Sequence, residues 1–429
     1  MNSQANPYHT PGPVGGTEGF IGRADILADV ARFLTTPQEK GLILYGHRGI
    51  GKTSLLRHLE FRLPREGPYA AVYFDPAAHS GKPLRQVLKA LALRIFETLS
   101  IPTVPFPEGD PSLAFESRIL DHVLSHLPKQ TVLVLLVDEF EAPAQSIPRP
   151  SESPLYPYLR FLMSGDHPSL KIIPAIGRCP EDLDRIYRTH FEGVYLKRVT
   201  NLTPEETAEL IRIPQKQNTL EWPQAQVSAV IDFTDGHPGL TRNLCRVVWD
   251  HLHRHRFTDI PLVRFKDVGQ SFPQAIKEAD AAFEWLWEGI GPRERVVASS
   301  LAEIGPGWID QKELIAALRH NGCIHLNGGV DRAARTLEQW GILHTKTGEY
   351  RIRINMFSRW IMARKSGDQV QEELNGFADR LFDAARERCR RGRLKEAISL
   401  LQRAVKLNPR HLKATELLAK VYVNAGHSE

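Results

Sequence analysis

One stretch of the chain, residues 41–56 with the sequence GLILYGHRGIGKTSLL, restricts the possible folds more than any other. Residues 42–45 form an apolar run of strand length, and residues 54–63 continue with helical periodicity. Between them lies the phosphate-binding motif G-x-x-x-x-G-K-T, Gly46 to Thr53, which we call the P-loop. The backbone N–H groups of such a loop, and the positive end of its helix, bind a phosphate chain. The sequence therefore predicts a nucleoside triphosphate site.

Two side chains of this motif have expected roles of their own. Lys52 can reach the β- and γ-phosphates, and the Thr53 hydroxyl can ligate Mg²⁺. A chance match in a glycine-rich loop is the alternative, which the flanking strand and helix disfavour. The predicted nucleotide-binding residues of the loop are Gly46, His47, Arg48, Gly49, Ile50, Gly51, Lys52, Thr53 and Ser54.

A second candidate element is the unbroken run of β-branched and leucine residues at 131–137, typical of a central parallel strand. The acidic pair Asp138-Glu139 follows it directly, and ligands bind at the carboxyl ends of strands in open α/β sheets. We expect Asp138 to hold Mg²⁺ through water and Glu139 to orient or deprotonate an attacking water. A solvated strand end is the alternative, which the presence of a good P-loop disfavours.

The next predicted strand, residues 171–177, delivers Arg178 to the same edge of the sheet. Arg178 could sense the γ-phosphate or stabilise charge in the transition state. It could equally be a surface arginine that pairs with Glu181 or Asp182. The predicted catalytic residues are thus Lys52, Asp138, Glu139 and Arg178, and the predicted metal ligands are Thr53 and Asp138.

Composition sets limits on the remaining functions. With 429 residues the chain can hold two to four domains, and its net charge of +5 neither demands nor excludes nucleic acid. The four cysteines lie far apart without C-x-x-C spacing, which argues against zinc and disulfides and fits a reducing cytosol. No apolar run approaches the length of a membrane helix, about 20 residues. The N-terminus does not resemble a signal peptide. We therefore expect a cytoplasmic protein without membrane contact.

The order of the predicted elements gives a domain plan. An extended leader (1–18) precedes a three-layer α/β core with a mainly parallel sheet (19–200) and an all-α subdomain (201–288). That subdomain begins with a capping box, in which Thr203 is the N-cap, Pro204 follows, and Glu206 closes the box. Inside it, residues 235–239 (DGHPG) form a tight turn from which His237 or Pro238 could face the nucleotide base.

The C-terminal part is predicted to contain three more segments. Three helices and a hairpin at 289–364 indicate a winged helix, 365–377 is a polar linker, and 378–429 has tetratricopeptide (TPR) spacing. The helix most able to read DNA, 330–340, carries two arginines but also Asp331 and Glu338, so internal packing is favoured over DNA binding. The charged run 386–391 is interpreted as a solvated helix face.

Taken together, these motifs make the chain resemble a STAND ATPase, one of the signal-transducing P-loop NTPases with numerous domains. GHRGIGKT matches that family's Walker A motif, VLLVDEFE its Walker B motif, and GHP at 236–238 its G-x-P motif. The resemblance implies an AAA+/STAND-like core, ATP rather than GTP as the nucleotide, and bacterial signalling such as antiphage defence. It further implies that Ile21, Gly22 and Arg23 line the base side of the pocket and that Arg178 is a sensor arginine.

One departure from the family concerns the end of the winged helix. Animal and plant relatives place a histidine there that contacts the ADP β-phosphate, whereas this chain has Arg353-Ile354-Asn355. Any lock of a closed state must therefore use other groups, with Arg353 and Asn355 as candidates. No effector domain is visible at either end, so the output of a signalling switch would lie in a partner protein or in further C-terminal sequence.

Three functional hypotheses remain open at this point. The first is a switch in which an ADP-bound closed monomer senses a ligand, exchanges ADP for ATP, oligomerises and acts on an effector through the TPR-like region. The second is a DNA-acting ATPase similar to origin-recognition or transposition-regulator ATPases, which would bind DNA with steep salt dependence. The third is a scaffold that binds nucleotide only for stability.

Overall fold

The computed structural model describes residues 5–9, 12–16, 19–138, 155–164, 167–177, 194–254, 260–320, 329–365, 367–408 and 411–426. The chain forms two compact units. The first unit is Met1–Ile231 with Gly236–Ala275, and the second is Asp232–Asp235 with Ile276–Glu429. Each unit is described by itself.

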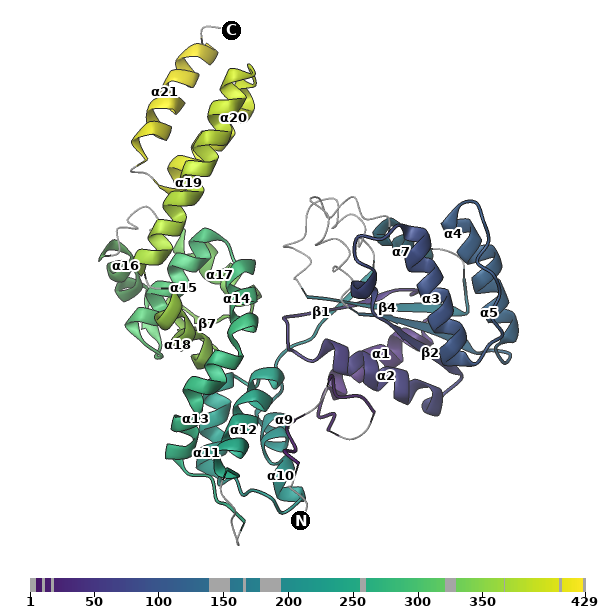
Figure 1. The fold of residues 1–429 in the computed structure, drawn as a ribbon. Helices are drawn as coiled ribbons and strands as arrows, with labels where there is room; N and C mark the ends of the chain where they lie inside the picture. Colours follow the sequence, from purple (N-terminus) through teal and green to yellow (C-terminus); the bar gives the residue numbers. More distant parts are fainter. Residues whose placement is uncertain are drawn as a thin grey trace. The chain divides into compact units, whose positions relative to one another are not determined.

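The first unit is built on a sheet of five parallel strands in the order β2-β3-β4-β1-β5 (Figure 1). The strands are β1 (Leu42–Tyr45), β2 (Tyr69–Phe74), β3 (Val132–Val137), β4 (Leu170–Ile176) and β5 (Tyr195–Arg198). The prediction of a parallel α/β sheet is therefore confirmed. Because β4 lies between β1 and β3, the carboxyl ends of all three strands meet at one edge.

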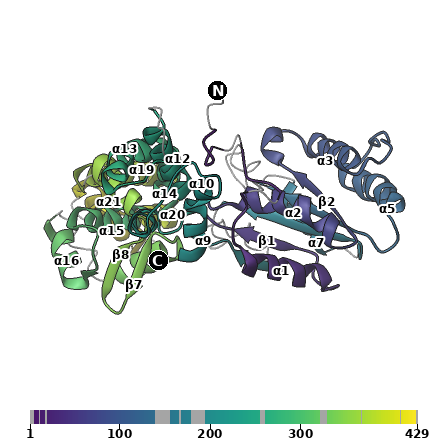
Figure 2. The same cartoon turned by 90° about the horizontal axis from the view of Figure 1, so that it is seen from below.

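Helices cover both faces of this sheet (Figures 1 and 2). Alternate residues of β3 point to opposite faces, as the two-residue repeat of a strand requires. Leu133, Leu135 and Val137 pack with α3 (Leu84–Leu99), α5 (Asp121–His126) and α7 (Leu155–Ser164). Val134 and Leu136 pack with α1 (Ala24–Thr35) and α2 (Lys52–Glu66). These core residues of β3 are at most 2% exposed, which explains why no polar residue interrupts the strand.

Some helices of the first unit differ from the predicted bounds. The helix predicted from Phe115 is one turn longer at its start, where Asp110 caps α4 (Pro111–Ala114), and a π-helical turn (Phe115–Leu120) then leads into α5. A short 3₁₀ turn, Pro76–His79, follows β2. The helix α7 was not predicted, because Pro157 lies inside it and Phe161 on its exposed side makes the sequence LYPYLRFLMS look almost uniformly apolar.

A helical subdomain completes the first unit. It contains α9 (Pro204–Ile211), α10 (Ile213–Lys216), α11 (Gln224–Thr234) and α12 (Pro238–Leu252), and α13 (Phe265–Glu278) continues across Ala275 into the second unit. The predicted capping box of α9 is confirmed: the Glu206 N–H donates to Thr203 Oγ1 (3.2 Å), and the Thr203 N–H donates to Glu206 Oε2 (2.9 Å).

The second unit begins with α14 (Asp280–Gly289) and α15 (Pro292–Ile304). It continues with β6 (Ile309–Asp310), α16 (Gln311–His320), α17 (Val330–Gln339), β7 (Leu343–Lys346), β8 (Glu349–Ile352) and α18 (Asn355–Arg364). The three strands form an antiparallel sheet in the order β6-β8-β7. The predicted hairpin is present, but its loop is shorter than expected. Lys346 pairs directly with Glu349, so the loop has only two residues, and Gly348 has the positive φ (72°) that such a short loop needs.

Three helices follow: α19 (Gly367–Arg390), α20 (Leu394–Leu407) and α21 (Leu412–Gly426). The segment predicted as a polar linker, 365–377, is helical from Gly367 onward. Its apolar residues continue a helical stripe, since Val370, Ala378 and Ala385 recur with the helical period and all three are buried. None of the helices in the described part of the chain is both long and apolar enough to span a bilayer.

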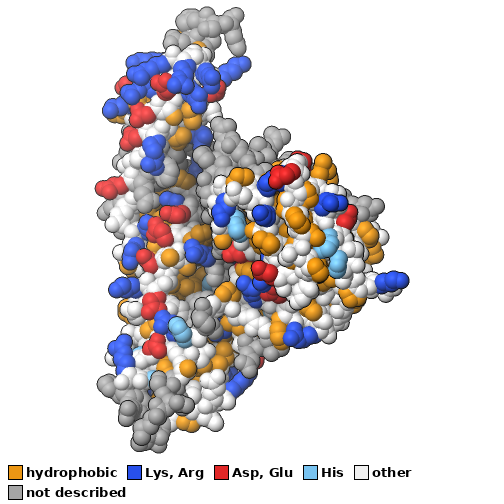
Figure 3. Space-filling view, turned by 45° about the vertical axis from the view of Figure 1, so that its right-hand side comes forward, with side chains coloured by type: hydrophobic (Ala, Val, Ile, Leu, Met, Phe, Trp, Pro, Cys, Tyr) orange, Lys and Arg blue, Asp and Glu red, His pale blue; other side chains and the backbone are white. Residues whose placement is uncertain are grey.

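Arginines gather where α19 ends and α20 begins, and blue side chains are dense near the top of Figure 3. They pair with the few acidic residues nearby: Arg391 with Glu387 (2.9 Å) and Arg388 with Glu396 (3.3 Å). These side chains are exposed to solvent, in agreement with the interpretation of this run as a solvated helix face.

Candidate nucleotide-binding site

The backbone of the P-loop has the shape that its glycines allow. Gly49 and Gly51 have φ values of 77° and 97°, a region that favours glycine over residues with a side chain. Gly51 is the N-cap of α2, so the helix begins at Lys52. The first backbone N–H groups of a helix have no partner within the helix, so the first turn of α2 is placed to bind an anion.

Lys52 is held by the loop itself. Its ammonium Nζ donates hydrogen bonds to the carbonyl oxygens of Gly46 (2.7 Å) and His47 (2.9 Å). The ammonium group thereby lies across the mouth of the loop, where a phosphate chain would bind. Thr53 and Ser54 follow in the first turn of α2, and both are partly buried.

The first turn of α12 packs directly on the P-loop. The Gly239 N–H donates to the Gly49 carbonyl oxygen at 3.2 Å. A Cβ on Gly239 would lie only 2.9 Å from that same oxygen, so this position has no room for a side chain. A Cβ on Gly51 would lie 3.9 Å from Cγ of Pro238. The predicted Gly-His-Pro turn thus lies beside the loop.

His237 makes a second bond between α12 and the P-loop. It is 3% exposed, and Nδ1 accepts the Leu240 N–H (3.3 Å) as the N-cap of α12. Since Nδ1 is an acceptor, the proton lies on Nε2, which donates to the Arg48 carbonyl oxygen (3.2 Å). Burial lowers the pKa of His237 to about 4, so the ring is neutral at physiological pH.

Arg23 joins three segments at the back of the loop. Its Nη2 donates to the Ile50 carbonyl oxygen (2.7 Å), and its Nη1 donates to the Thr200 carbonyl oxygen. Its backbone N–H donates to Glu206 Oε1 (3.0 Å), the carboxylate that also closes the capping box of α9. Burial lowers the pKa of Arg23, but an arginine stays charged at any physiological pH. Arg23 is therefore a fixed positive group beside the P-loop.

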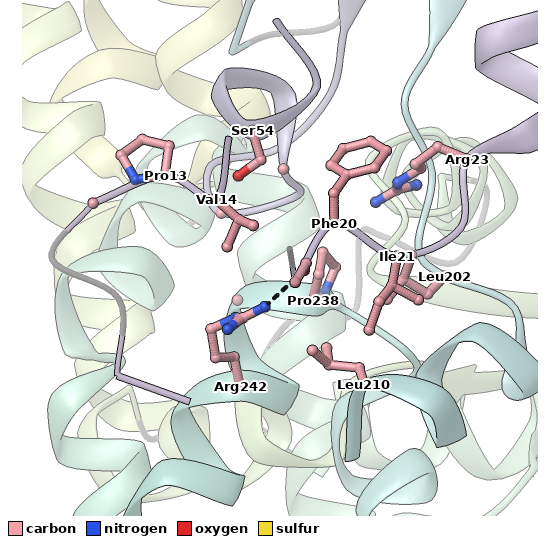
Figure 4. A pocket seen from close by; sticks show the side chains of 15 residues that line it. Pro13, Val14, Phe20, Ile21, Arg23, Ser54, Leu202, Leu210, Pro238 and Arg242 are labelled. Carbon is pink, nitrogen blue, oxygen red and sulfur yellow. Dashed lines mark hydrogen bonds between the residues drawn. The ribbon is translucent and has the colours of Figure 1, made fainter. Parts of the chain in front are cut away.

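A cavity of about 200 Å³ lies next to these contacts (Figure 4). Its apolar lining includes Val14, Ile21 and Pro238, with Leu202 and Leu210 from the segment around α9. Arg242 borders it and donates through Nη2 to the Gly19 carbonyl oxygen at 3.4 Å. An apolar lining of this kind suits a flat group such as a nucleotide base. Gly49 and Gly51 of the P-loop border the same cavity, so a base in the cavity would lie next to phosphates bound at the loop.

Asp138 lies at the carboxyl end of β3 and is 2% exposed. Its Oδ2 accepts a hydrogen bond from the Tyr73 hydroxyl (2.8 Å) on the neighbouring strand β2. Burial, with the adjacent Asp138, raises the pKa of Tyr73 above its ordinary value, so the phenol stays protonated and donates. This hydrogen bond fixes the Asp138 carboxylate at the carboxyl end of β3.

The residues present fit a magnesium ion. Thr53 and Asp138 offer oxygen donors, which Mg²⁺ prefers. Among the described residues, no group of three or more His, Cys, Asp or Glu side chains could hold a metal ion. A site with few protein ligands is the usual arrangement for Mg²⁺ that arrives with substrate phosphates.

The predicted site residues have different places in the structure. The loop Gly46–Ser54, Arg23, His237 and Pro238 come together, and Ile21 lines the cavity. Gly22 does not line the cavity. Its φ is 71°, and a Cβ at this position would lie 2.3 Å from the Glu206 side chain, so the position favours glycine for a reason of local packing. Glu139 and Arg178 lie outside the described residues.

Several residues of the site were missed from sequence, and Arg242 and Tyr73 are two examples. Arg242 lies four residues after Pro238 on α12, so both side chains face the same side of the helix, and this spacing could have identified it. Tyr73 ends a strand of ordinary apolar sequence, and only the pairing of β2 with β3 brings it to Asp138. No local pattern could have identified Tyr73.

Comparisons with known proteins agree with this geometry. Residues 19–179 match the family model of the AAA ATPase domain. Among curated proteins, no relative matches the sequence significantly. Among solved structures, the chain is similar to the Walker-type ATPase PABY2304 of Pyrococcus abyssi: the identity is 15%, the TM-score is 0.59, and 82% of this chain and 99% of that chain are covered.

A second similar structure is the ORC2 protein of Aeropyrum pernix in its ADPNP–ADP complexes. The identity is 13% and the TM-score 0.51, with 84% of this chain and 98% of that chain covered. At such identities the likeness concerns the fold alone. Residues 19–179 thus match the AAA ATPase domain model, and the chain has a P-loop NTPase fold.

Proposed function

We propose that this chain is a STAND-type signalling switch that binds ATP and hydrolyses it slowly. In the ADP-bound state it is a closed monomer. A ligand sensed by the C-terminal region favours exchange of ADP for ATP, and the ATP-bound chain oligomerises and recruits or activates an effector protein. The setting implied by the resemblance to STAND ATPases is the cytoplasm of a bacterium defending itself against phage.

The observation that carries this proposal is the contact between the P-loop and the first turn of α12. His237 donates to the Arg48 carbonyl oxygen, and Gly239 donates to the Gly49 carbonyl oxygen. A change in the loop that accompanies exchange of nucleotide would therefore move α12. A nucleotide can shift a conformational equilibrium only if it binds the two states with different affinity, and α12 offers a direct way to achieve this.

The residues of the site have the following proposed roles. Lys52 would transfer its hydrogen bonds from the loop carbonyls to the β- and γ-phosphates. Thr53 and Asp138 would hold Mg²⁺, which when bound neutralises charge on the phosphates. Glu139 would orient the attacking water, and Arg178 would contact the γ-phosphate. Ile21, Pro238 and the other cavity residues would bind the base.

The second unit has a proposed role in sensing and assembly. Its three helices α15, α16 and α17 and its antiparallel sheet have the element order expected of a winged helix. Its last three helices share a core that includes Ala385, Leu401 and Ala414, which supports the proposal that they pack as TPR-like hairpins. We propose that this TPR-like region binds the protein partner.

The experiment that tests the switch is mass photometry with ADP and with a non-hydrolysable ATP analogue. Growth from a monomer to a defined oligomer with the ATP analogue alone is the expected result. The variant Lys52→Ala should stay monomeric in both nucleotides, because it lacks the ammonium that binds the phosphates. An oligomer that forms equally with ADP, or in Lys52→Ala, would contradict the proposal.

The second candidate is a DNA-acting ATPase, favoured by the element order of residues 292–364 and by the shared fold with ORC2. The exposed face of α17 argues against it, because it carries Asp331 and Glu338 beside Arg332 and Arg335. In addition, the Tyr350 hydroxyl donates to Asp331 at 2.9 Å, so part of this face of α17 already makes contacts within the second unit. ATP hydrolysis stimulated by DNA, with binding that weakens steeply as salt rises, would favour this candidate over the switch.

A further inference from the structure

The N-terminal leader is anchored on the helical subdomain of the first unit. Tyr8 is only 1% exposed, and its hydroxyl donates to the carbonyl oxygen of Ile211, the last residue of α9. Asn6 donates through Nδ2 to the carbonyl oxygen of Arg246 (3.1 Å) and to Oδ1 of Asp250 (2.8 Å), both on α12. A buried tyrosine with three anchoring hydrogen bonds around it is unusual for an extended terminal segment, which is normally loosely held.

The same leader is also attached to the sheet domain. His58 of α2 donates through Nδ1 to the Gly16 carbonyl oxygen (2.6 Å). The ring of His58 stacks on Phe20 with centroids 4.0 Å apart. Gly15 passes so close to α2 that a Cβ there would lie 3.1 Å from Cβ of Arg57. We call residues 5–9 and 12–16 the N-terminal strap.

Between its two attachments, the strap forms one wall of the candidate base cavity. Gly12, Pro13 and Val14 line it, and Val14 faces it from the side opposite Ile21 and Leu202 (Figure 4). The Asn6 and Tyr8 anchors are bound to α9 and α12, the two helices that also supply Leu210 and Pro238 to the cavity. The strap therefore connects α2 with α9 and α12 along one wall of the cavity.

We propose that Tyr8 and Asn6 are positioning residues that hold the N-terminal strap over the nucleotide base and so set the rate at which nucleotide leaves. This proposal rests on the proposed nucleotide site. The buried phenol stays neutral at all physiological pH, because burial raises the pKa of Tyr8 well above its ordinary value, so the anchor is permanent rather than pH-dependent. Release of the strap removes the wall formed by Pro13 and Val14 and exposes the base to water.

The strap lines the candidate base cavity, whereas Lys52, Gly46 and His47 do not line it. Lys52 and the loop carbonyls that it contacts belong to the other end of the site. Loss of the strap should therefore weaken binding of a nucleoside diphosphate but not of inorganic tripolyphosphate, which has the phosphates and no base. This difference separates a positioning role from general damage to the site.

The test uses the full chain and three variants: Tyr8→Ala, Tyr8→Phe and the matched control His9→Ala. His9 is the exposed neighbour of Tyr8. For each we would measure the affinity and dissociation rate of ADP, the affinity of tripolyphosphate, and the thermal unfolding temperature. Tyr8→Phe keeps the packed ring and loses the hydroxyl with its bond to Ile211, so it should fold even if Tyr8→Ala does not.

The expected result is a graded loss confined to ADP. Tyr8→Phe should speed ADP dissociation by about threefold to tenfold, as expected for one lost hydrogen bond, and Tyr8→Ala by more. Tripolyphosphate affinity should stay as in the wild type, and His9→Ala should change nothing. ADP dissociation unchanged in both Tyr8 variants, or ADP and tripolyphosphate weakened equally, would overturn the strap proposal alone. Wild-type protein that binds neither ligand would overturn the nucleotide site itself.

Discussion

Arg353 and Asp235 form an ion pair in which Nε and Nη2 of the guanidinium each lie 2.8 Å from Oδ2 of the carboxylate. His344 of β7 contacts the other carboxylate oxygen at 3.2 Å. Asp235 has a φ of 50°, and Gly236 after it a φ of 69°, so the pair fixes a sharp turn in the chain just before His237. Arg353 is one of the two candidate lock groups, and in the structure it pairs with this aspartate.

Removal of that guanidinium should loosen the second unit around Asp235. Arg353→Ala removes both guanidinium contacts from a mostly buried carboxylate, a change that costs about 1–3 kcal/mol. We expect faster hydrogen exchange in peptides that cover residues 232–235 and 343–352, measured by mass spectrometry. Arg359→Ala, an exposed arginine of α18, is the control and should exchange as the wild type does. Equal exchange in both variants would show that the pair fixes nothing.

The close approach of α12 to the P-loop gives a second prediction. A Cβ on Gly239 would lie 2.9 Å from the Gly49 carbonyl oxygen, so Gly239→Ala must push α12 away from the loop. Overpacking of this kind costs about 1–3 kcal/mol, and we expect ADP affinity, measured by calorimetry, to fall by roughly tenfold. Gly269→Ala is the control: it also lies within a helix, but no atom lies within 4 Å of its Cβ position. It should leave affinity unchanged.

The neutral, buried ring of His237 makes stability depend on pH. Its pKa is about 4 in the folded chain and 6.5 ordinarily, so the unfolded chain binds the proton more tightly. The contribution to stability is therefore complete above pH 6.5 and is lost as the pH falls towards 4, by roughly 3 kcal/mol. His237→Gln lacks this titration. The difference in unfolding free energy between wild type and variant should shrink across that range, and a constant difference would refute the assignment.

Local sequence was sufficient for the elements that carry their own pattern. The helix Leu84–Leu99 has the predicted bounds, because its apolar residues repeat with the helical period. The capping box at Thr203 and the P-loop between β1 and α2 are equally local, since each depends on residues a few positions apart. These features together located the phosphate end of the candidate site.

Features that depend on distant parts of the chain could not be predicted in this way. Lys171 begins a predicted strand and might be expected in solvent, yet it is 2% exposed and donates to the carbonyl oxygens of Phe33 (3.3 Å) and Thr36 (2.5 Å). Its environment is the carboxyl end of α1, whose position follows only from the strand order. The burial of Tyr8 depends in the same way on α9 and α12, which lie some two hundred residues later in the chain.

The bond between Tyr73 and Asp138 leads to a prediction about catalysis. Asp138 is buried, and Tyr73 donates to its Oδ2 at 2.8 Å, so the phenol orients the carboxylate that we expect to hold Mg²⁺. The guanidinium of Arg57 lies 3.5 Å from the centre of the Tyr73 ring and holds the ring in place. Tyr73→Phe keeps the ring and removes only the donor, which leaves one oxygen of a buried carboxylate without this bond.

We expect Tyr73→Phe to lower kcat for ATP hydrolysis by about tenfold, since a misaligned metal ligand affects the transition state more than the bound nucleotide. The affinity for ADP measured without Mg²⁺ should stay within about twofold of the wild type, because the variant leaves Lys52, the residue proposed to bind the phosphates, unchanged. Tyr69→Phe, a partly buried tyrosine at the start of the same strand, is the control and should hydrolyse ATP normally. Weaker ADP binding at an unchanged kcat would mean that Tyr73 supports the fold of the pocket and does not orient Asp138.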